Sequence, residues 1–453
     1  MSPDAPRTAT DLLEEALADA HFNGDASDVW PTHIIATDWW TRRPILAAVY
    51  DWARARLVPP ELLLSHVLVE LALRVPANVV LPPIIGGPVA LNLGIVNVAE
   101  TGVGKTSAGR GLLASATERD LTGDTFPIGT GEGIAELLID DDDGARRSHG
   151  RPVLIHADEG RALEELIARK GSTLASTLCS AVSGATFGQG NADPKKRRRV
   201  PALSYRLAVV LNVQPIHLRG VLAEVDAGLP QRFMFMSGTG HHLTDWDIAE
   251  PDRLELPFVE LDQFHATTGA YWTLVVPETI RDLIRREHLE RLHALDCGES
   301  VAHRSHRNLL RLRLAALLAI ADHRGDVTVD DWDLSVAPVD ASDATIHRGE
   351  VLRAELARLE AQAQTDRAVR HGVAVDVAVE TSRVERLARK VSCWIWSTPG
   401  ITRKDVARRL SRDAPAMLDE ALELATRRCW IVERSEPGQG EPKRVLYPGE
   451  VHP

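Results

Sequence analysis

Apolar residues recur at helical spacing in the first patterned stretch of the chain, between about residues 40 and 75. There WWTRRPILAAVYDWARARLVPPELLLSHVLVELALRV places apolar side chains three and four positions apart, with Pro59 and Pro60 in the middle. Because proline lacks the N–H that an interior helix position needs, the pair predicts a break between two consecutive helices.

Continuous apolar runs farther along predict buried strands. They are ALNLGIVNV (90–98), PVLIHA (152–157) and YRLAVVLNV (205–213), and a fourth run, FMFM, follows Arg232. A helical pattern over 105–117 separates the first two runs, and charged helical patterns fill about 278–378. Strands that alternate with helices indicate an α/β core with a mainly parallel sheet.

The octapeptide AETGVGKT stands where the first predicted strand meets a helix, and an alanine replaces its usual first glycine. Gly102 and Gly104 would let backbone N–H groups turn inward around phosphate oxygens. Lys105 would supply a charge for the β- and γ-phosphates, and the Thr106 hydroxyl a ligand for Mg²⁺. The motif therefore predicts a site for ATP and Mg²⁺. The other predicted cofactor-binding residues of this loop are Glu100, Thr101, Val103 and Ser107.

An acidic pair, Asp158 and Glu159, directly follows the predicted strand 152–157. ATP hydrolysis needs one carboxylate that holds Mg²⁺ through water and a second that orients the attacking water. We assign the nucleotide and metal contact to Asp158 and the role of catalytic base to Glu159. Acidic residues are common at helix N-termini. The pair therefore indicates a catalytic role only because a phosphate loop precedes it.

Two further polar residues border predicted strands. Asn212, near the end of the strand 205–213, is expected to bond the attacking water or the γ-phosphate. The alternative is an asparagine that merely ends a strand. Arg232 precedes FMFM, where a guanidinium could reach the γ-phosphate of a neighbouring subunit. The alternative there is a surface arginine without a catalytic role.

The stretch DPKKRRRV (193–200) carries five consecutive bases in a chain of net charge −12. The acidic balance excludes a surface that coats nucleic acid throughout, so any DNA contact must use a local patch. Three readings stay open: a solvated loop, a nuclear import signal, or a DNA-facing loop. Flanking glycines favour a hairpin that returns into the strand of Asn212. The predicted DNA-binding residues are Lys195, Lys196, Arg197, Arg198 and Arg199.

The order of phosphate loop, acidic pair, Asn-tipped strand and LPQRF (229–233) resembles that of AAA+ ATPases, in particular the hexameric replicative helicases. LPQRF is similar to the arginine-finger element of the minichromosome-maintenance proteins. The segment 305–335 looks like their helical lid, whose second-sensor arginine matches Arg307, with Arg304 and Arg311 as competitors. In those helicases, a hairpin at the position of the basic run projects into a central pore and grips DNA phosphates.

The chain is similar over about residues 38–345 to helicase-like ATPases of uncharacterised type from actinobacterial plasmids, phages and integrative elements. The resemblance is carried by YDWARARLVPPELLLSHVLVELALRVPANVVLPPIIGG, LNVQP and DAGLPQRF. It implies ATP and Mg²⁺ as cofactors and a homo-oligomeric ring, expected to be a hexamer, around single-stranded DNA. The phosphate loop lacks the asparagine typical of superfamily-three viral helicases, and priming activity is not expected.

The C-terminal pattern predicts a separate module. A helix, a turn, a helix opened by Thr402 with Asp405 at capping-box spacing, and a third helix precede WIVE and RVLYP, which form a hairpin wing. The third helix, in DAPAMLDEALELA, is acidic where a groove-reading helix would be basic. DNA binding and docking of a replication or element-encoded partner therefore both stay open.

Together these patterns predict an AAA+ P-loop protein with four parts. They are an N-terminal helical region (1–85), the ATPase core (86–265), a helical lid with a linker helix (266–380), and a winged helix-turn-helix domain (381–453). Four cysteines without metal-ligand spacing indicate reduced core thiols. We expect no membrane-spanning segment and a location in a bacterial cytoplasm.

Two functional hypotheses follow from these expectations. The first is a DNA-stimulated ATPase, a helicase- or translocase-like motor in the replication of a plasmid, phage or integrative element. The second is a nucleotide-switched DNA- or partner-binding protein, such as an initiator, regulator or defence component, that unwinds nothing. Replacement of the five bases distinguishes them, because only a motor should lose DNA-stimulated turnover.

Overall fold

The structure, a computed structural model, divides into two compact units, Met1–Leu356 and Ala357–Pro453. The residues that the structure describes are 35–115, 124–142, 145–148, 150–193, 197–225, 228–238, 249, 251, 254, 256–257, 259–297, 306–410, 417–437 and 443–453.

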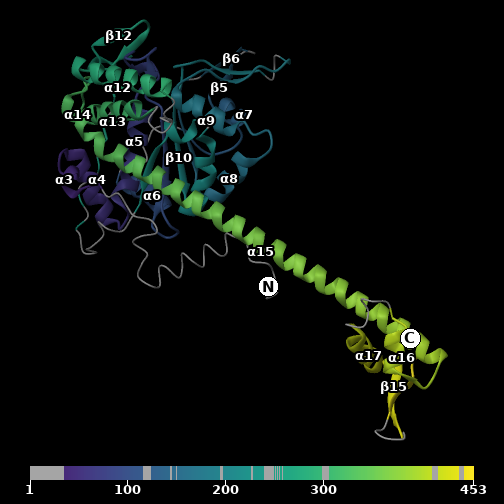
Figure 1. Ribbon diagram of the computed structural model, residues 1–453. Helices are drawn as coiled ribbons and strands as arrows, with labels where there is room; N and C mark the ends of the chain where they lie inside the picture. The colour runs from purple at the N-terminus through teal and green to yellow at the C-terminus, as the bar shows by residue number, and fades with distance from the viewer. Residues whose placement is uncertain are drawn as a thin grey trace. The chain divides into compact units, whose positions relative to one another are not determined.

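Five parallel strands form the central sheet of the first unit, in the order β11-β3-β10-β7-β4. Figure 1 labels its middle strand, β10. This sheet confirms the predicted α/β class, and the four apolar runs each supply a strand. The polar edge strand β4 was not predicted. The bounds are β3 Leu93–Val98, β4 Asp124–Pro127, β7 Pro152–Ala157, β10 Arg206–Val213 and β11 Met234–Ser237.

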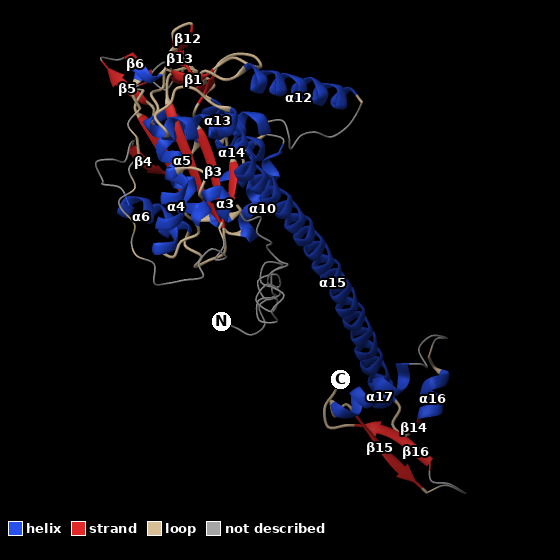
Figure 2. Cartoon of the chain, turned by 90° about the vertical axis from the view of Figure 1, so that its left-hand side faces the viewer, coloured by secondary structure: helices blue, strands red, loops and turns tan. Residues whose placement is uncertain are grey.

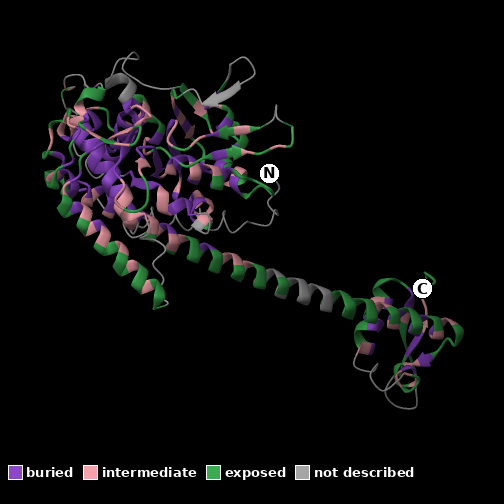
Figure 3. Ribbon diagram, turned by 90° about the horizontal axis from the view of Figure 1, so that it is seen from above, coloured by how far each residue is buried: buried purple, intermediate pink, exposed green. Residues whose placement is uncertain are grey.

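Helices cover both faces of this sheet. Because side chains alternate between faces along a strand, Ile95 packs into one core with α5, and Val96 packs into another with α8, α9 and α10. Buried residues concentrate in these layers (Figure 3). The helices are α5 Pro60–Arg74 and α6 Lys105–Ser115 on the first face, with α8 Gly160–Ala168, α9 Leu174–Ser183 and α10 Leu218–Leu222 on the second.

The N-terminal helices confirm the predicted break. Helix α4 ends at Ala55, Pro59 stands at the N-cap of α5, and Pro60 is the first residue of α5. Helix α5 is buried along nearly its whole length because it lies between the sheet and the helices α4 and α13. Apolar residues accordingly occur all around it, and its charged residues Glu61, Glu70 and Arg74 are buried with them. The two helices that precede it are α3 Thr37–Trp40 and α4 Pro44–Ala55.

Smaller elements surround this core. A four-stranded sheet, in the order β12-β13-β1-β2, contains β1 Val79–Leu81, β2 Val89–Ala90, β12 Ala266–Thr268 and β13 Tyr271–Thr273 (Figure 2). Two antiparallel hairpins are β5 Ile139–Asp142 with β6 Ala145–Ser148, and β8 Phe187–Gln189 with β9 Arg198–Val200. The remaining helices are α7 Gly131–Glu136, α11 Leu229–Arg232, α12 Glu278–Asp296, α13 Arg307–Ala321, α14 Val329–Leu334 and α15 Val336–Ser397, and α15 runs across the boundary between the units.

The second unit contains the predicted elements in the predicted order. The oxygen of Thr402 caps α16 by accepting a hydrogen bond from the backbone N–H of Asp405, with 3.3 Å between N and Oγ1. The elements after α15 are β14 Ile401–Thr402, α16 Arg403–Arg408, α17 Leu418–Arg427, β15 Ile431–Glu436 and β16 Lys443–Pro448, with an antiparallel sheet in the order β14-β16-β15. Assignment of this unit as a winged helix stays a prediction.

The prediction of core thiols was wrong for three of the four cysteines. Only Cys179 is buried, whereas Cys297, Cys393 and Cys429 are exposed, and all four are free. Cys393 lies at an exposed position of α15, whereas Cys297 and Cys429 lie just after the ends of α12 and α17. None of the helices that the structure describes has a stretch long and apolar enough to cross a membrane.

Candidate nucleotide-binding site

The connections between successive strands of the central sheet change direction between the neighbouring strands β3 and β10. The chain leaves β3 toward β4 at one edge of the sheet, and it leaves neighbouring β10 toward β11 at the other edge. In open parallel sheets, ligands bind in the crevice outside the carboxyl ends of two such strands. The predicted phosphate loop follows β3, and Asn212 lies near the end of β10, so the predicted site falls at this position.

The loop of residues 99–106, here called the glycine loop, has the backbone that its glycines allow. Gly102 and Gly104 adopt φ values of +87° and +104°, in the left-handed region that other residues rarely enter. A β-carbon on Gly102 would meet open space, so an incoming group has direct access to the backbone there. The loop ends at Lys105, where α6 begins, so free N–H groups of a helix N-terminus face the same region.

Lys105 is buried beneath the glycine loop. Its Nζ donates to the carbonyl oxygen of Ala99 and to that of Glu100, the latter over 3.0 Å. Burial lowers the pKa of the ammonium group, and the Glu100 carboxylate offsets this only in part. Because the ammonium group is poorly solvated, an anion bound in the loop would interact with it strongly. The side chains of Thr106 and Ser107 are exposed beside it.

The structure brings Asp158 and Asn212 into direct contact. Asn212 Nδ2 donates to Asp158 Oδ1 over 2.8 Å, and Asp158 Oδ2 lies 3.5 Å from Nδ1 of His156. Asp158 and Glu159 are both exposed, and Glu159 stands at the N-cap of α8 without a capping hydrogen bond from its side chain. A carboxylate and a hydroxyl, from Asp158 and Thr106, suit Mg²⁺ when phosphate and water oxygens complete its shell. Among the described residues, no cluster of three or more His, Cys, Asp or Glu side chains could hold a metal ion by itself.

Two residues near this site were not predicted. Asn97 of β3 lies opposite Asn212 in the sheet, and its Nδ2 donates to Asn212 Oδ1 over 3.0 Å. His66 of α5 packs so closely against Gly109 of α6 that a β-carbon there would lie 3.0 Å from the ring. Burial lowers the pKa of His66 to about 4, although the charge of Asp158 acts in the opposite direction. The lone polar residue in LGIVNV was a usable signal for Asn97, whereas His66 had none.

Arg232 does not reach the glycine loop of its own chain. It lies two residues before β11, which runs parallel to β3 with Ser237 opposite Val98. Arg232 is therefore at the amino end of a strand that spans roughly 13 Å, and the glycine loop is at the carboxyl end of its neighbour. The Arg232 guanidinium donates to Ser183 Oγ over 3.1 Å and to the carbonyl oxygen of Gly228 over 2.8 Å.

The candidates for the lid arginine are also held elsewhere. Arg307 donates to Asp343 Oδ2 over 2.8 Å and pairs with Asp340, both on α15. Arg311 is buried, with its guanidinium carbon 3.8 Å from the centre of the Trp332 ring. These contacts give Arg311 a structural role. Arg304 lies outside the described residues.

The basic run forms part of the predicted hairpin. Lys195 and Lys196 lie outside the described residues. Arg197 Nε donates to the carbonyl oxygen of Asn191 over 2.8 Å, and Arg198 Nε donates to Glu136 Oε2 over 2.7 Å. Arg199 is exposed on β9, opposite Gly188 of β8.

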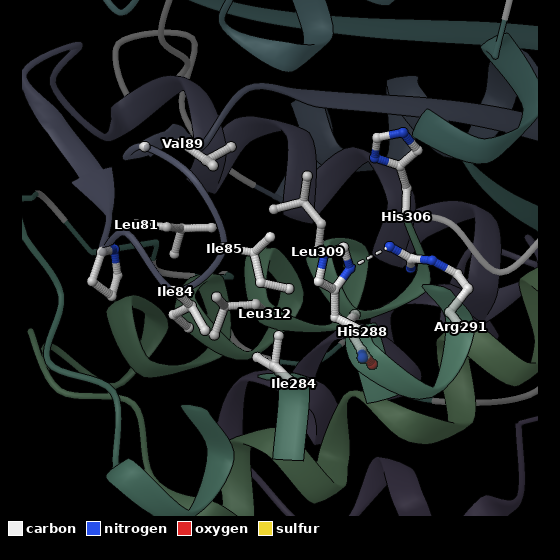
Figure 4. A pocket seen from close by; sticks show the side chains of 13 residues that line it. Leu81, Ile84, Ile85, Val89, Ile284, His288, Arg291, His306, Leu309 and Leu312 are labelled. Carbon is white, nitrogen blue, oxygen red and sulfur yellow. Dashed lines mark hydrogen bonds between the residues drawn. The ribbon is translucent and has the colours of Figure 1, made fainter. Parts of the chain in front are cut away.

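A cavity of about 270 Å³ lies between the β1–β2 connection and the helices α12 and α13 (Figure 4). Aliphatic side chains such as Ile85 and Leu312 line most of it. Arg291, bonded over 2.7 Å to Nδ1 of His288, lies at its polar part. No residue of the glycine loop contributes to its lining, so it is distinct from the candidate site.

Comparison with known proteins gives no family for this chain. No protein-family model matches the sequence, and no curated protein matches it. Among solved structures, the chain is similar to a full-length MCM homolog from Methanopyrus kandleri, with 16% sequence identity and a TM-score of 0.34. The match covers 76% of this chain and 63% of that protein, which is less than two thirds of its length. The function therefore has to be argued from the site.

Proposed function

We propose that the chain is an ATPase of AAA+ type that acts as a motor on DNA. The observation that carries the proposal is the contact of Asn212 with Asp158 beside a glycine loop at the switch point of a parallel sheet. The loop N–H groups and Lys105 would bind the phosphates, and Thr106 and Asp158 would hold Mg²⁺. The metal would neutralise charge on the phosphate oxygens. Glu159, exposed next to Asp158, would accept the proton of the attacking water.

The position of Arg232 supports assembly into a ring. A guanidinium at the amino end of β11 is too far from the glycine loop of its own chain to stabilise charge on the transferred phosphate. In a head-to-tail ring, the same guanidinium would face the nucleotide of the next subunit. We therefore infer a homo-oligomer, a hexamer by the resemblance described above, in which Arg232 completes the neighbouring site and Arg307 belongs to the lid.

The hairpin β8–β9 supports DNA as the partner. In the described part of the hairpin, Arg198 and Arg199 lie on β9 and Arg197 directly precedes it. The chain then continues from Val200 into β10, the strand of Asn212. A displacement of Asn212 when the nucleotide binds or is hydrolysed would therefore be transmitted through β10 to the basic hairpin. A ring of such hairpins would concentrate positive charge around a single strand in an otherwise acidic protein, as a helicase or translocase requires. We place this activity in the replication of a plasmid, phage or integrative element.

The C-terminal part differs in charge from the rest of the chain. Residues 381–453 contain 14 Lys and Arg and 10 Asp and Glu, a net charge of +4 against −16 for residues 1–380. Exposed acids on α17, namely Asp419, Glu420 and Glu423, oppose insertion of that helix into a DNA groove. We propose a winged-helix module that binds the DNA backbone or an element-encoded partner.

A second candidate is a nucleotide-switched binding protein without unwinding activity. Contacts within the chain favour it, because Arg197 and Arg198 already bond to Asn191 and Glu136 and are less available to phosphates. The two candidates differ in turnover. A motor should show Mg²⁺-dependent hydrolysis that single-stranded DNA accelerates and a ring-sized particle by light scattering with ATP. A switch should bind DNA with ATP but show no acceleration.

A further inference from the structure

Asn97 is a fully buried asparagine inside the most apolar part of the sheet. It lies on β3 with Val96 and Val98 as neighbours and with Asn212 of β10 opposite it. Its Nδ2 donates to Asn212 Oδ1 over 3.0 Å, and Asn212 Nδ2 donates in turn to Asp158 Oδ1 over 2.8 Å. Two consecutive hydrogen bonds thus link β3 to β10, and β10 to Asp158, the residue that follows β7.

The donor-to-acceptor direction of these two hydrogen bonds is determined at their exposed end, Asp158. An ionised carboxylate only accepts hydrogen bonds, so the group of Asn212 that faces Asp158 must be its NH₂. The carbonyl oxygen of Asn212 then faces Asn97 and needs a donor. The NH₂ of Asn97 supplies that donor, and a reversed amide of either asparagine would place two acceptors or two donors against each other.

The hydrogen bonding of the second polar atom of Asn97, Oδ1, distinguishes a positioning role for this residue from a structural one. Asn97 Oδ1 is buried and, among the described residues, has no hydrogen-bond partner. Asn92, just before the same strand, is equally buried, but both its amide nitrogen and its amide oxygen are hydrogen-bonded. It donates to Ala181 O over 2.8 Å and accepts from Arg206 Nη1 and from the N–H of Leu207. Asn92 therefore holds the fold together, whereas Asn97 leaves an acceptor unsatisfied and orients Asn212.

We propose that Asn97 is a positioning residue for ATP hydrolysis. It fixes the side-chain amide of Asn212 so that the Asn212 NH₂ points out of the sheet toward Asp158 and the phosphates. Without that donor, only the contact with Asp158 would hold the Asn212 amide, which would then be free to tilt away from the phosphates. This inference rests on the proposed ATPase function and assigns a specific role to a residue that touches neither nucleotide nor metal.

The test compares Asn97 of β3 with Asn92, the buried asparagine just before that strand, in the full-length chain. Asn97→Leu keeps the side-chain size but removes the donor, and Asn92→Leu is the matched control. We expect Asn97→Leu to lower kcat for ATP at least tenfold while KM changes less than threefold. Asn92→Leu should lower the melting temperature but leave kcat of the folded protein within twofold of the wild type. Asn97→Ala, which cannot overfill the site, provides the same comparison if the leucine variant does not fold.

A double-mutant cycle tests whether Asn97 acts through Asn212. In the background of Asn212→Ala, Asn97→Leu should change kcat less than twofold, because its target is already absent. Losses that multiply in the double variant, or an Asn97→Leu protein with wild-type kcat, would overturn the inference. A wild-type chain that hydrolyses no ATP would instead refute the proposed function, so the two failures are distinguishable.

Discussion

The side chain of Asn212 donates a hydrogen bond to the carboxylate of Asp158, with 2.8 Å between Nδ2 and Oδ1. The two residues come from the neighbouring strands β10 and β7, beside the glycine loop that follows β3. This contact joins the proposed phosphate-sensing amide to the proposed metal ligand. It is the reason to interpret the carboxyl end of the sheet as a hydrolytic site.

Glu159→Gln should abolish turnover while nucleotide binding persists. Glutamine keeps the shape of the exposed side chain but cannot accept a proton, and general-base catalysis contributes about 10²–10⁴ in rate. We expect kcat for ATP to fall at least about 100-fold and the Kd of a fluorescent ATP analogue to change less than about threefold. Glu165→Gln, on the exposed side of α8 and paired with Arg161, is the control and should retain wild-type turnover. An active Glu159→Gln protein would remove Glu159 from the mechanism.

Arg232 should act on the nucleotide of a neighbouring subunit. Arg232→Ala removes the proposed arginine finger and Lys105→Ala removes the lysine of the glycine loop, so each protein alone should be inactive. Mixed rings contain some interfaces with both residues intact, and hydrolysis should therefore reappear on mixing, to at most about a quarter of the wild-type rate per subunit for random assembly. Arg219→Ala, at an arginine bound to Glu164, serves as the control and should hydrolyse ATP without a partner. If the mixture stays inactive although mixed rings form, Arg232 does not act across the interface.

Replacement of the five bases Lys195 to Arg199 by serine should weaken DNA binding most at low salt. Each phosphate contact on a single strand contributes about −0.7 to the slope of log K against log salt. Loss of all five contacts should therefore make the slope shallower by about 3.5, as measured by titration of fluorescent single-stranded DNA. Serine at Arg161 and Lys170, elsewhere on the first unit, provides the control. An unchanged slope would show that the hairpin does not contact DNA.

Asp331 should stabilise the first unit at neutral pH and not in acid. Burial alone raises the pKa of this carboxyl group, but hydrogen bonds from Arg324 and Thr328 outweigh it, and the net pKa lies below the ordinary value. A depressed pKa adds stability above the ordinary value near 4, and that stability is lost as the pH falls through the native pKa.

The measurement for Asp331 is unfolding in urea as a function of pH. Asp331→Asn removes the buried carboxylate that Arg43 and Arg324 share, although both keep Asp322, and should cost about 2 kcal/mol at pH 7. The cost should shrink toward pH 3. Asp330→Asn, at the exposed neighbouring position, should cost less than about 1 kcal/mol at either pH. A cost for Asp331→Asn that is independent of pH would contradict the ionic role.

The sequence predicted the parts of the site better than their contacts. Apolar runs identified β10, which carries Asn212 and is buried on both faces, and β7, which Asp158 follows. The strand β4 in DTFP left none, because its side chains are mostly exposed and need not be apolar. Asn97 was overlooked because one polar residue barely changes an apolar run. Its role depends on the register that places it opposite Asn212, which only the folded sheet defines.

The central claim is that this chain couples ATP hydrolysis to DNA. The most direct test is the Mg²⁺-dependent rate of ATP hydrolysis by the full-length protein, with and without single-stranded DNA, beside Glu159→Gln as the blank. The account predicts a rate well above the blank that rises severalfold with DNA. A rate equal to that of Glu159→Gln under both conditions would contradict it.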